Sequence, residues 1–215
     1  MRARSVALGA AAAAAFSSAA AAAPCATTSL SSYIALGSGG CTVGDETFSN
    51  FAYAPTNTVA ASGVTVTPTP SATAPGLQFS PSTNWGSFVT SGGSFNLSFG
   101  VAAGPGKAIT DASLFADIIT GFPTDTETIS AGGVVIASLK ATIFSPTATA
   151  TFAGVADITQ DETATFFPSE NIIDGVTKNF SETPLATPEP SSLALLGVGL
   201  SALGLTGRRR RRRRS

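Results

Sequence analysis

Apolar and polar residues alternate with a period of two over much of the middle of the chain. Four apolar residues alternate with small or polar ones from Phe95 to Val101, and Val64 and Val66 alternate with threonines. A similar β-prone run lies between Phe48 and Phe51. Because successive side chains of a strand point to opposite faces, this spacing predicts half-buried β-strands.

Longer β-branched stretches follow, at Val134 to Phe144, Ala148 to Ile158 and Ile109 to Thr120. Glycine and proline separate these stretches, and no long amphipathic pattern of helical period lies between them. Thr67 to Pro75 contains three prolines, so it predicts a loop or an edge strand. Many short strands with turn signals about every ten residues predict an all-β fold, an antiparallel β-sandwich.

The N-terminus has the layout of a secretory signal. Arg2 and Arg4 precede an uncharged, alanine-rich stretch that ends in several A-x-A frames before Ala23. We interpret residues 1–23 as a signal peptide that is removed from the mature protein. Cys25 also raises the alternative of a lipoprotein signal, but Pro24 stands where a small residue should precede a lipidated cysteine.

The C-terminus predicts a membrane segment. Residues 183–192 form a Pro-rich spacer, 193–207 are apolar, and 208–215 are basic. The uncharged run from Ser191 to Gly207 would span about 25 Å as a helix, which is short for a hydrocarbon core of about 30 Å. The basic run should stay cytoplasmic and stop transfer; it comprises Arg208, Arg209, Arg210, Arg211, Arg212, Arg213 and Arg214.

The same tail resembles the PEP-CTERM sorting signal of bacterial exported proteins, a motif that some ice-binding proteins also carry at their C-termini. The resemblance rests on the triplet Pro188, Glu189 and Pro190, the Ser-Ser-Leu-Ala-Leu-Leu-Gly segment from Ser191, and the closing arginines. It implies processing by the membrane enzyme exosortase and delivery to the cell surface or an extracellular polysaccharide matrix. An ordinary single-span anchor is the alternative.

Between these ends lies the expected exported domain, residues 24–182. Its two cysteines, Cys25 and Cys41, are expected to pair in an oxidising compartment. Between them, Thr28 or Ser29 can cap a short helical turn with Leu30 on its apolar face. We therefore expect a disulfide-stapled helical turn at the start of the domain.

The composition of the chain argues against several classes of function. Residues 25–187 contain three lysines and twelve carboxylates, and histidine is absent from the chain. An acidic domain does not suit a nucleic-acid partner. The missing histidine removes the commonest general base and metal ligand. We expect no enzyme, no cofactor, and no catalytic, cofactor-binding or metal-binding residues.

Three groups of residues offer alternatives. The carboxylate groups could bind calcium or act as a glycosidase pair, but we interpret them as solvated acidic turns; they are Asp45 with Glu46, Asp125 with Glu127, Asp157, and Asp161 with Glu162. Trp85 is expected in the core rather than on a sugar-binding face. Thr147, Thr149 and Thr151 would present hydroxyls on one face, as some ice-binding surfaces do, but without a repeat they indicate a solvated strand.

The sequence thus predicts a non-catalytic exported surface or extracellular-matrix protein. It would be anchored in the inner membrane by its C-terminal helix until exosortase processes it. Extracellular polysaccharide is a candidate partner. The alternative is a carbohydrate- or calcium-binding β-sandwich module on the cell surface.

Overall fold

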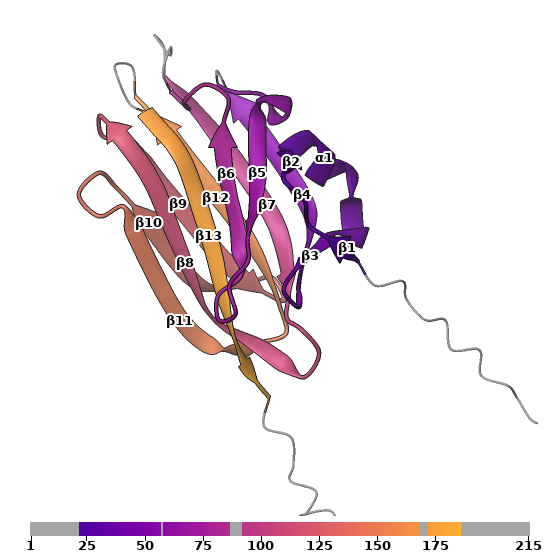
Figure 1. Cartoon of the computed structure of the whole chain (residues 1–215). Coiled ribbons are helices and arrows are strands. Elements are labelled where there is room, and N and C mark those ends of the chain that lie inside the picture. The colour runs from indigo at the N-terminus through magenta and orange to yellow at the C-terminus, as the bar shows by residue number, and fades with distance from the viewer. Residues whose placement is uncertain (1–21, 57, 87–91, 168–171, 186–215) are drawn as a thin grey trace, which may run out of the picture.

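The structure is a computed structural model that describes residues 22–56, 58–86, 92–167 and 172–185. Two sheets face each other, and one short helix lies at the N-terminal side of the pair (Figure 1). The strand pairs are antiparallel, as the predicted sandwich requires, except for a short parallel pair between β1 and β3. The predicted all-β, two-sheet fold is confirmed.

The first sheet has seven strands in the order β1-β3-β4-β7-β12-β9-β10. Its strands are β1 (Ala23–Pro24), β3 (Cys41–Val43), β4 (Glu46–Thr56), β7 (Gly93–Ala102), β12 (Asp157–Phe166), β9 (Thr124–Ala131) and β10 (Val134–Ala141). The long central strand β12 pairs with both β7 and β9.

The second sheet has six strands in the order β11-β8-β13-β6-β5-β2. Its strands are β11 (Thr147–Val155), β8 (Lys107–Thr120), β13 (Ile172–Pro184), β6 (Gly76–Pro81), β5 (Val64–Thr69) and β2 (Thr28–Ser29). The last strand of the domain, β13, therefore lies inside the sheet, between β8 and β6. It includes the first two residues of the Pro-rich segment.

The N-terminal turn forms as predicted. Ser29 is the N-cap of helix α1 (Leu30–Ala35), and its hydroxyl accepts a hydrogen bond from the Ser32 amide. Its buried face includes Leu30 and Tyr33, and the 3-10 turn η1 (Gly37–Gly39) follows it. A second 3-10 turn, η2 (Ala61–Gly63), precedes β5. Because Ser29 supplies an acceptor for an orphan amide, six residues are enough for a helix here.

The strands agree with the predicted periods, with two differences. The predicted run from Ala148 to Ile158 is divided at Ala156 into the end of β11 and the start of β12, which belong to different sheets. The run from Val134 ends as a strand at Ala141, because a turn follows in which Thr142 bridges Ser145. Pro68 lies in β5, beside the two-residue strand β2, at the edge of its sheet.

Phenylalanines fill the space between the sheets at the α1 side of the domain. The ring of Phe99 lies 5.2 Å from that of Phe51, 5.9 Å from Phe79, 6.1 Å from Phe48 and 6.2 Å from Phe180, measured between centroids. Both sheets contribute to this cluster, so it holds them together. Rings at these separations add to the hydrophobic gain from burial.

Within the ranges that the structure describes, no helix has the length and apolar character needed to cross a membrane. The predicted signal peptide (1–23) lies almost wholly outside those ranges, and the predicted membrane segment (193–207) and the arginine run lie wholly outside them.

Candidate functional site

A lysine lies inside the sandwich. On β13 the inward side chains of Val176 and Phe180 flank Lys178, whose side chain has no exposed surface. Strand alternation alone turns Lys178 inward with its apolar neighbours. An ammonium group removed from water is tolerated when carboxylates surround it.

The carboxylates come from the opposite sheet. Glu127 on β9 lies directly across from Glu162 on β12, and their cross-strand row continues into Leu97 and Leu139. The next row contains Asp125. All three carboxyls are buried. Like charges opposite each other destabilise a sheet, so this row requires a cation facing it.

Lys178 is that cation. Its Nζ donates to Glu127 Oε2 at 2.8 Å and lies 3.1 Å from Glu162 Oε2. Asp125 lies diagonal to Glu162 across the β9–β12 pair, because its direct partner on β12 is Ala164. We call Lys178, Asp125, Glu127 and Glu162 the buried charge cluster; it joins β13 of one sheet to β9 and β12 of the other.

Burial and neighbouring charges set the protonation of this cluster. Burial raises the pKa of Asp125 well above its usual range, and the negative charge of Glu162 raises it further, so Asp125 is the neutral member. Burial also raises the pKa of Glu127, against the lowering effect of Lys178. For Lys178, burial lowers the pKa, but the three carboxyls outweigh it and the net direction is upward. Lys178 is therefore an ammonium ion, and Asp125 is a neutral acid close to it.

Several polar atoms of the cluster have no hydrogen-bond partner among the described residues, although Glu162 forms an ion pair with Lys178. These atoms are both carboxyl oxygens of Asp125 and of Glu162 and Oε1 of Glu127; the side-chain nitrogen and oxygen of Gln160, two residues before Glu162 on β12, also have none. A proton on Asp125 resolves part of this deficit, because its hydroxyl can donate to Glu162. The cluster is thus held close but incompletely satisfied, which is costly in a core.

The interpretation of Asp125 and Glu127 as solvated turn residues is wrong, and it is also wrong for Glu46 and Glu162. These acids lie on strands, with alternate residues outward, so Asp45 and Asp161 are exposed while their sequence neighbours point inward. Asp157 is exposed, as expected. Because Asp125 and Glu127 have no exposed surface, a polysaccharide cannot contact them in the folded domain.

The sequence contained a signal for this arrangement. In the stretch Thr124-Asp-Thr-Glu-Thr-Ile, threonines alternate with two acids and then with buried Ile129. Ile129 fixes which face is inward, and the acids share it. Lys178 could be found in the same way, from its place between Val176 and Phe180.

A second lysine cluster lies at the surface. Lys107, at the start of β8, has its Nζ 2.5 Å from Asp45 Oδ2 and 3.0 Å from Glu182 Oε2. The Gly104 amide donates to Glu182 Oε1 at 2.6 Å. Hydrogen bonding to Lys107 lowers the pKa of Asp45, and Asp45 in turn raises that of Lys107. This surface cluster ties the exit of β13 to the β3–β4 turn.

Next to it, Glu46 is buried without a hydrogen-bond partner among the described residues. Burial is the main cause that raises the pKa of Glu46 to about 9, and Glu182 and Asp45 add to it. Glu46 is therefore a neutral acid at neutral pH.

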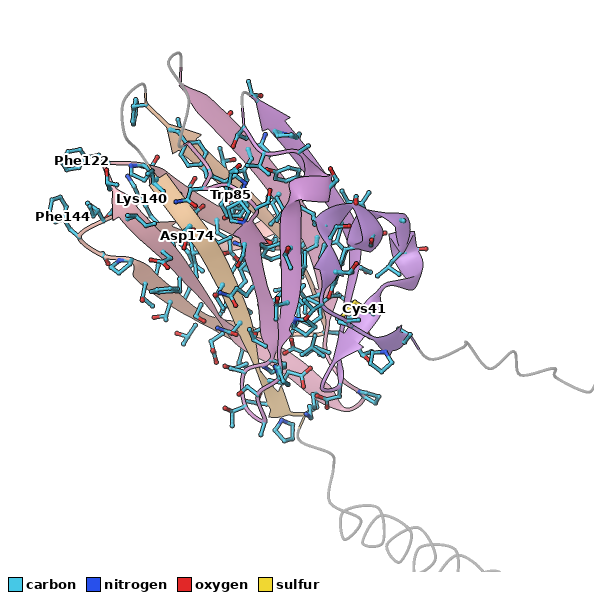
Figure 2. The ribbon with its side chains drawn as sticks, turned by 45° about the horizontal axis from the view of Figure 1, so that its top comes forward. Cys41, Trp85, Phe122, Lys140, Phe144 and Asp174 are labelled. Atoms are coloured by element: carbon cyan, nitrogen blue, oxygen red, sulfur yellow. A yellow bond between two sulfur atoms is a disulfide. The ribbon has the colours of Figure 1, made fainter. Side chains whose placement is uncertain are left out.

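An aromatic pair projects from the far end of the domain. Phe122, in the β8–β9 turn, and Phe144, in the β10–β11 turn, are 68% and 85% exposed, and their ring centroids lie 6.1 Å apart. Figure 2 shows both rings beyond the strands, on the side of the domain opposite Cys41. Exposed aromatic side chains grouped in this way are typical of contact surfaces.

Trp85 lies in the core, as predicted, and Figure 2 shows it between the sheets. Its Nε1 donates to the Tyr53 hydroxyl at 3.1 Å. The Tyr53 hydroxyl in turn donates to the Val59 carbonyl at 2.9 Å. Its ring centroid lies 4.6 Å from that of Phe95. Trp85 is thus fixed in place by both its polar atom and its ring.

The three threonines of β11 do share the exposed face of an edge strand. Across the strand pair, however, Thr147 faces Phe115, Thr149 faces Ser113 and Thr151 faces Asp111. The neighbouring row is therefore not a second row of threonines, which agrees with a solvated strand.

Cys25 and Cys41 form the expected disulfide, with their Cα atoms 4.9 Å apart. Within the described ranges, no three His, Cys, Asp or Glu side chains are grouped so that they could hold a metal ion. The sorting triplet Pro188, Glu189 and Pro190 and the seven arginines lie outside the described residues.

The described part of the chain is a disulfide-bonded β-sandwich whose last strand leads directly to the C-terminal tail. Residues 186–213 match the family model described as the PEP-CTERM protein-sorting motif. The chain therefore carries a PEP-CTERM sorting tail, the signal of an exported protein that is targeted by exosortase.

No curated protein matches the chain. Among solved structures it is similar to one described as TmCBM61 in complex with beta-1,4-galactotriose. That likeness has 11% sequence identity, covers 62% of this chain and 88% of the other, and has a TM-score of 0.34. A TM-score of this size carries no argument about fold or ligand.

Proposed function

We propose that this chain is a non-catalytic surface or extracellular-matrix protein that exosortase releases from the inner membrane. The observation that carries the proposal is the PEP-CTERM motif, which begins at residue 186, just after β13 ends at Pro184. In this proposal the tail directs the sandwich domain to its destination. The disulfide supports an oxidising destination.

The test compares the chain in its host with the chain in the same host lacking exosortase. With the enzyme, the mature protein should end near Pro188 to Ser191 and reach the surface. Without it, the protein should keep the full tail in the inner membrane. A variant with Pro188→Ala and Pro190→Ala should behave as if the enzyme were missing, because those prolines keep the cleavage region extended.

Intact-mass measurement gives the answer. A surface product from the normal host that still contains Arg208 to Arg214 would show a plain membrane anchor and contradict the sorting proposal. A Lys140→Ala variant is a suitable control, since Lys140 is exposed on β10 and remote in sequence from the tail.

We also propose that the domain itself turns over no polysaccharide or ester. Support comes from the missing histidine and from the burial of Asp125 and Glu127. Hydrolysis of a common polysaccharide that disappears in Asp125→Ala or Glu127→Ala, with folding retained, would contradict it.

A second candidate function, carbohydrate binding, is favoured by the exposed pair Phe122 and Phe144. Aromatic rings offer sugars an apolar face against which C–H groups can pack. A glycan array with and without calcium tests it, using the double variant Phe122→Ala, Phe144→Ala. The matched control is Val134→Ala, an exposed apolar residue at the start of β10. Binding to a defined glycan that the double variant alone loses supports this function, and silence with the intact protein removes it.

A further inference from the structure

The buried charge cluster contains every group needed for a condensation reaction. A primary amine, the Lys178 Nζ, lies 3.1 Å from an oxygen of the Glu162 carboxyl and 2.8 Å from Glu127. A third carboxyl, Asp125, lies diagonal to Glu162 across the same strand pair. All four side chains are buried. We propose that Lys178 and Glu162 form an intramolecular amide bond after the domain has folded.

The surroundings favour that reaction over a permanent ion pair. The ion pair is flanked in its cross-strand row by Leu97 and Leu139. Charges in such a setting lose their hydration and are stable only with excellent geometry. An amide removes one positive and one negative charge from the core. Holding the two groups in contact also replaces a bimolecular encounter by an effective concentration far above any in solution.

The neighbouring acids have separate roles. Glu127 accepts a proton from the Lys178 ammonium, which frees the nitrogen lone pair. Asp125, held neutral by burial, donates its proton to the Glu162 carboxyl and makes the carbon more electrophilic. Nζ then bonds to Cδ of Glu162, and a tetrahedral intermediate forms.

The intermediate collapses with balanced protons. The nitrogen returns a proton to Asp125, the C–O bond breaks, and the leaving hydroxyl takes the proton held by Glu127. One water molecule is released. One hydrogen of that water is the proton that Asp125 gave to Glu162, the other came from Lys178 through Glu127, and the oxygen comes from Glu162. Because the nitrogen has replaced the proton of Asp125, Asp125 and Glu127 end as they began, and no oxidant or cofactor is needed.

Glu162 is assigned as the acceptor because Nζ lies 3.1 Å from its Oε2, whereas Glu127 is the residue to which Nζ donates its hydrogen bond. Asp125, the proton donor, also lies diagonal to Glu162 across the β9–β12 pair. The bond would join β13 to β12, and thus one sheet to the other. It would fasten the strand that leads into the sorting tail to the centre of the facing sheet.

Peptide mapping tests the proposal on the full-length chain. The chain is isolated unfolded from inclusion bodies, refolded with its disulfide formed, and digested at intervals with a protease that does not depend on lysine. We expect a branched peptide that joins the segment around Glu162 to that around Lys178, lighter than its two parts by one water. Folded protein that yields only linear peptides with an unmodified Lys178 would overturn the proposal.

Conservative variants identify the partners. Glu162→Gln keeps the size of the side chain and should give the same branched product, because attack on the carboxamide releases ammonia in place of water. Glu127→Gln should release only water if any linkage forms. A branch that maps to residue 127 would overturn the assignment of Glu162. Lys178→Arg should give no branch.

Asp125→Asn tests the acid. It should fold, as circular dichroism can verify, and slow the appearance of the branch by a factor of about 100 or more, the usual size of general acid catalysis. An unchanged rate would overturn the role of Asp125. The matched control is Asp161→Asn, an exposed acid on β12 next to Glu162, which should leave the rate unchanged.

Discussion

Two lysines of this domain each lie between two carboxylates, at very different depths. Lys178 faces Glu127 and Glu162 with no exposed surface on any of the three. Lys107 faces Asp45 and Glu182 at the surface, where its side chain is 34% exposed. The distances are similar, from 2.5 to 3.1 Å.

This difference indicates that the burial of such a cluster, rather than its distances, determines how much it contributes to stability. At the surface, water and salt screen the charges, and the pair adds little. In the core, each charge has lost its hydration, so the members depend on one another. The surface cluster can lose a member at little cost in stability, whereas the loss of a charge from the buried charge cluster should cost several kcal/mol.

The largest effect is therefore expected from Lys178→Met. Removing the ammonium leaves the facing carboxylates unpaired, and the free energy of unfolding should fall by about 3–5 kcal/mol. Urea denaturation measures it. Adding Glu127→Gln and Glu162→Gln to this variant should recover part of the loss, since no charge then remains unpaired. If Lys178→Met is as stable as the parent protein, the buried carboxyls do not depend on Lys178.

The next largest effect should come from the disulfide. Replacing Cys25 and Cys41 by alanine opens a loop with a sequence separation of 16, and should cost about 3 kcal/mol. Urea denaturation of both forms measures the difference. If denatured, unreduced protein reacts with a thiol reagent, the bond is absent and the expected loss disappears.

An effect whose size depends on pH is expected from Glu46→Gln. The folded pKa of Glu46 is raised to about 9, so the folded state holds its proton more tightly than the unfolded state. Stability should fall as the pH rises from 4.5 towards 9, by at most about 1.4 kcal/mol per pH unit. The neighbours Glu182, Asp45 and Asp111 add to this shift, and Lys107 opposes it.

Because glutamine has no proton to lose, Glu46→Gln should become more stable than the parent protein at alkaline pH and equal to it near pH 4. Denaturation midpoints across this range provide the measurement. Parallel curves for the two proteins would show that Glu46 ionises normally in the fold.

The smallest effect should come from Lys107→Met. Asp45 is exposed to water, and Glu182 keeps its hydrogen bond from the Gly104 amide. The midpoint of urea denaturation should therefore fall less than for Lys178→Met, and less in high salt than in low salt. A loss as large as that of Lys178→Met would show that the surface cluster is not screened and would remove the contrast between the two lysines.

Sequence reasoning found the fold because most strands alternate apolar with polar residues, as Phe95 to Val101 do. It found the helix α1 because Ser29 is a strong N-cap residue. It did not anticipate β9, where the inward positions are filled by Asp125 and Glu127 instead of apolar residues. Acids at inward positions lack the hydrophobic pattern on which such prediction depends.

The charge cluster could not be predicted as a unit for a different reason. Lys178 is separated from Glu127 by 51 residues and belongs to the other sheet. Local periodicity can indicate that each side chain is inward, but the pairing of β13 with β8 and the stacking of the two sheets decide that they meet. That information is tertiary.

The position of β13 inside its sheet has a consequence for the order of folding. β13 is the last strand to leave the export machinery, yet it separates β8 from β6, and its Val176 pairs with Phe79 far back in the chain. The second sheet therefore cannot close until the chain has emerged as far as Pro184. Pairings this distant in sequence are slow to form, and unfinished sheet edges invite association with other chains. A tail that holds each emerging chain at the membrane would keep neighbouring chains apart during this interval, so retention at the membrane would also serve as time to fold.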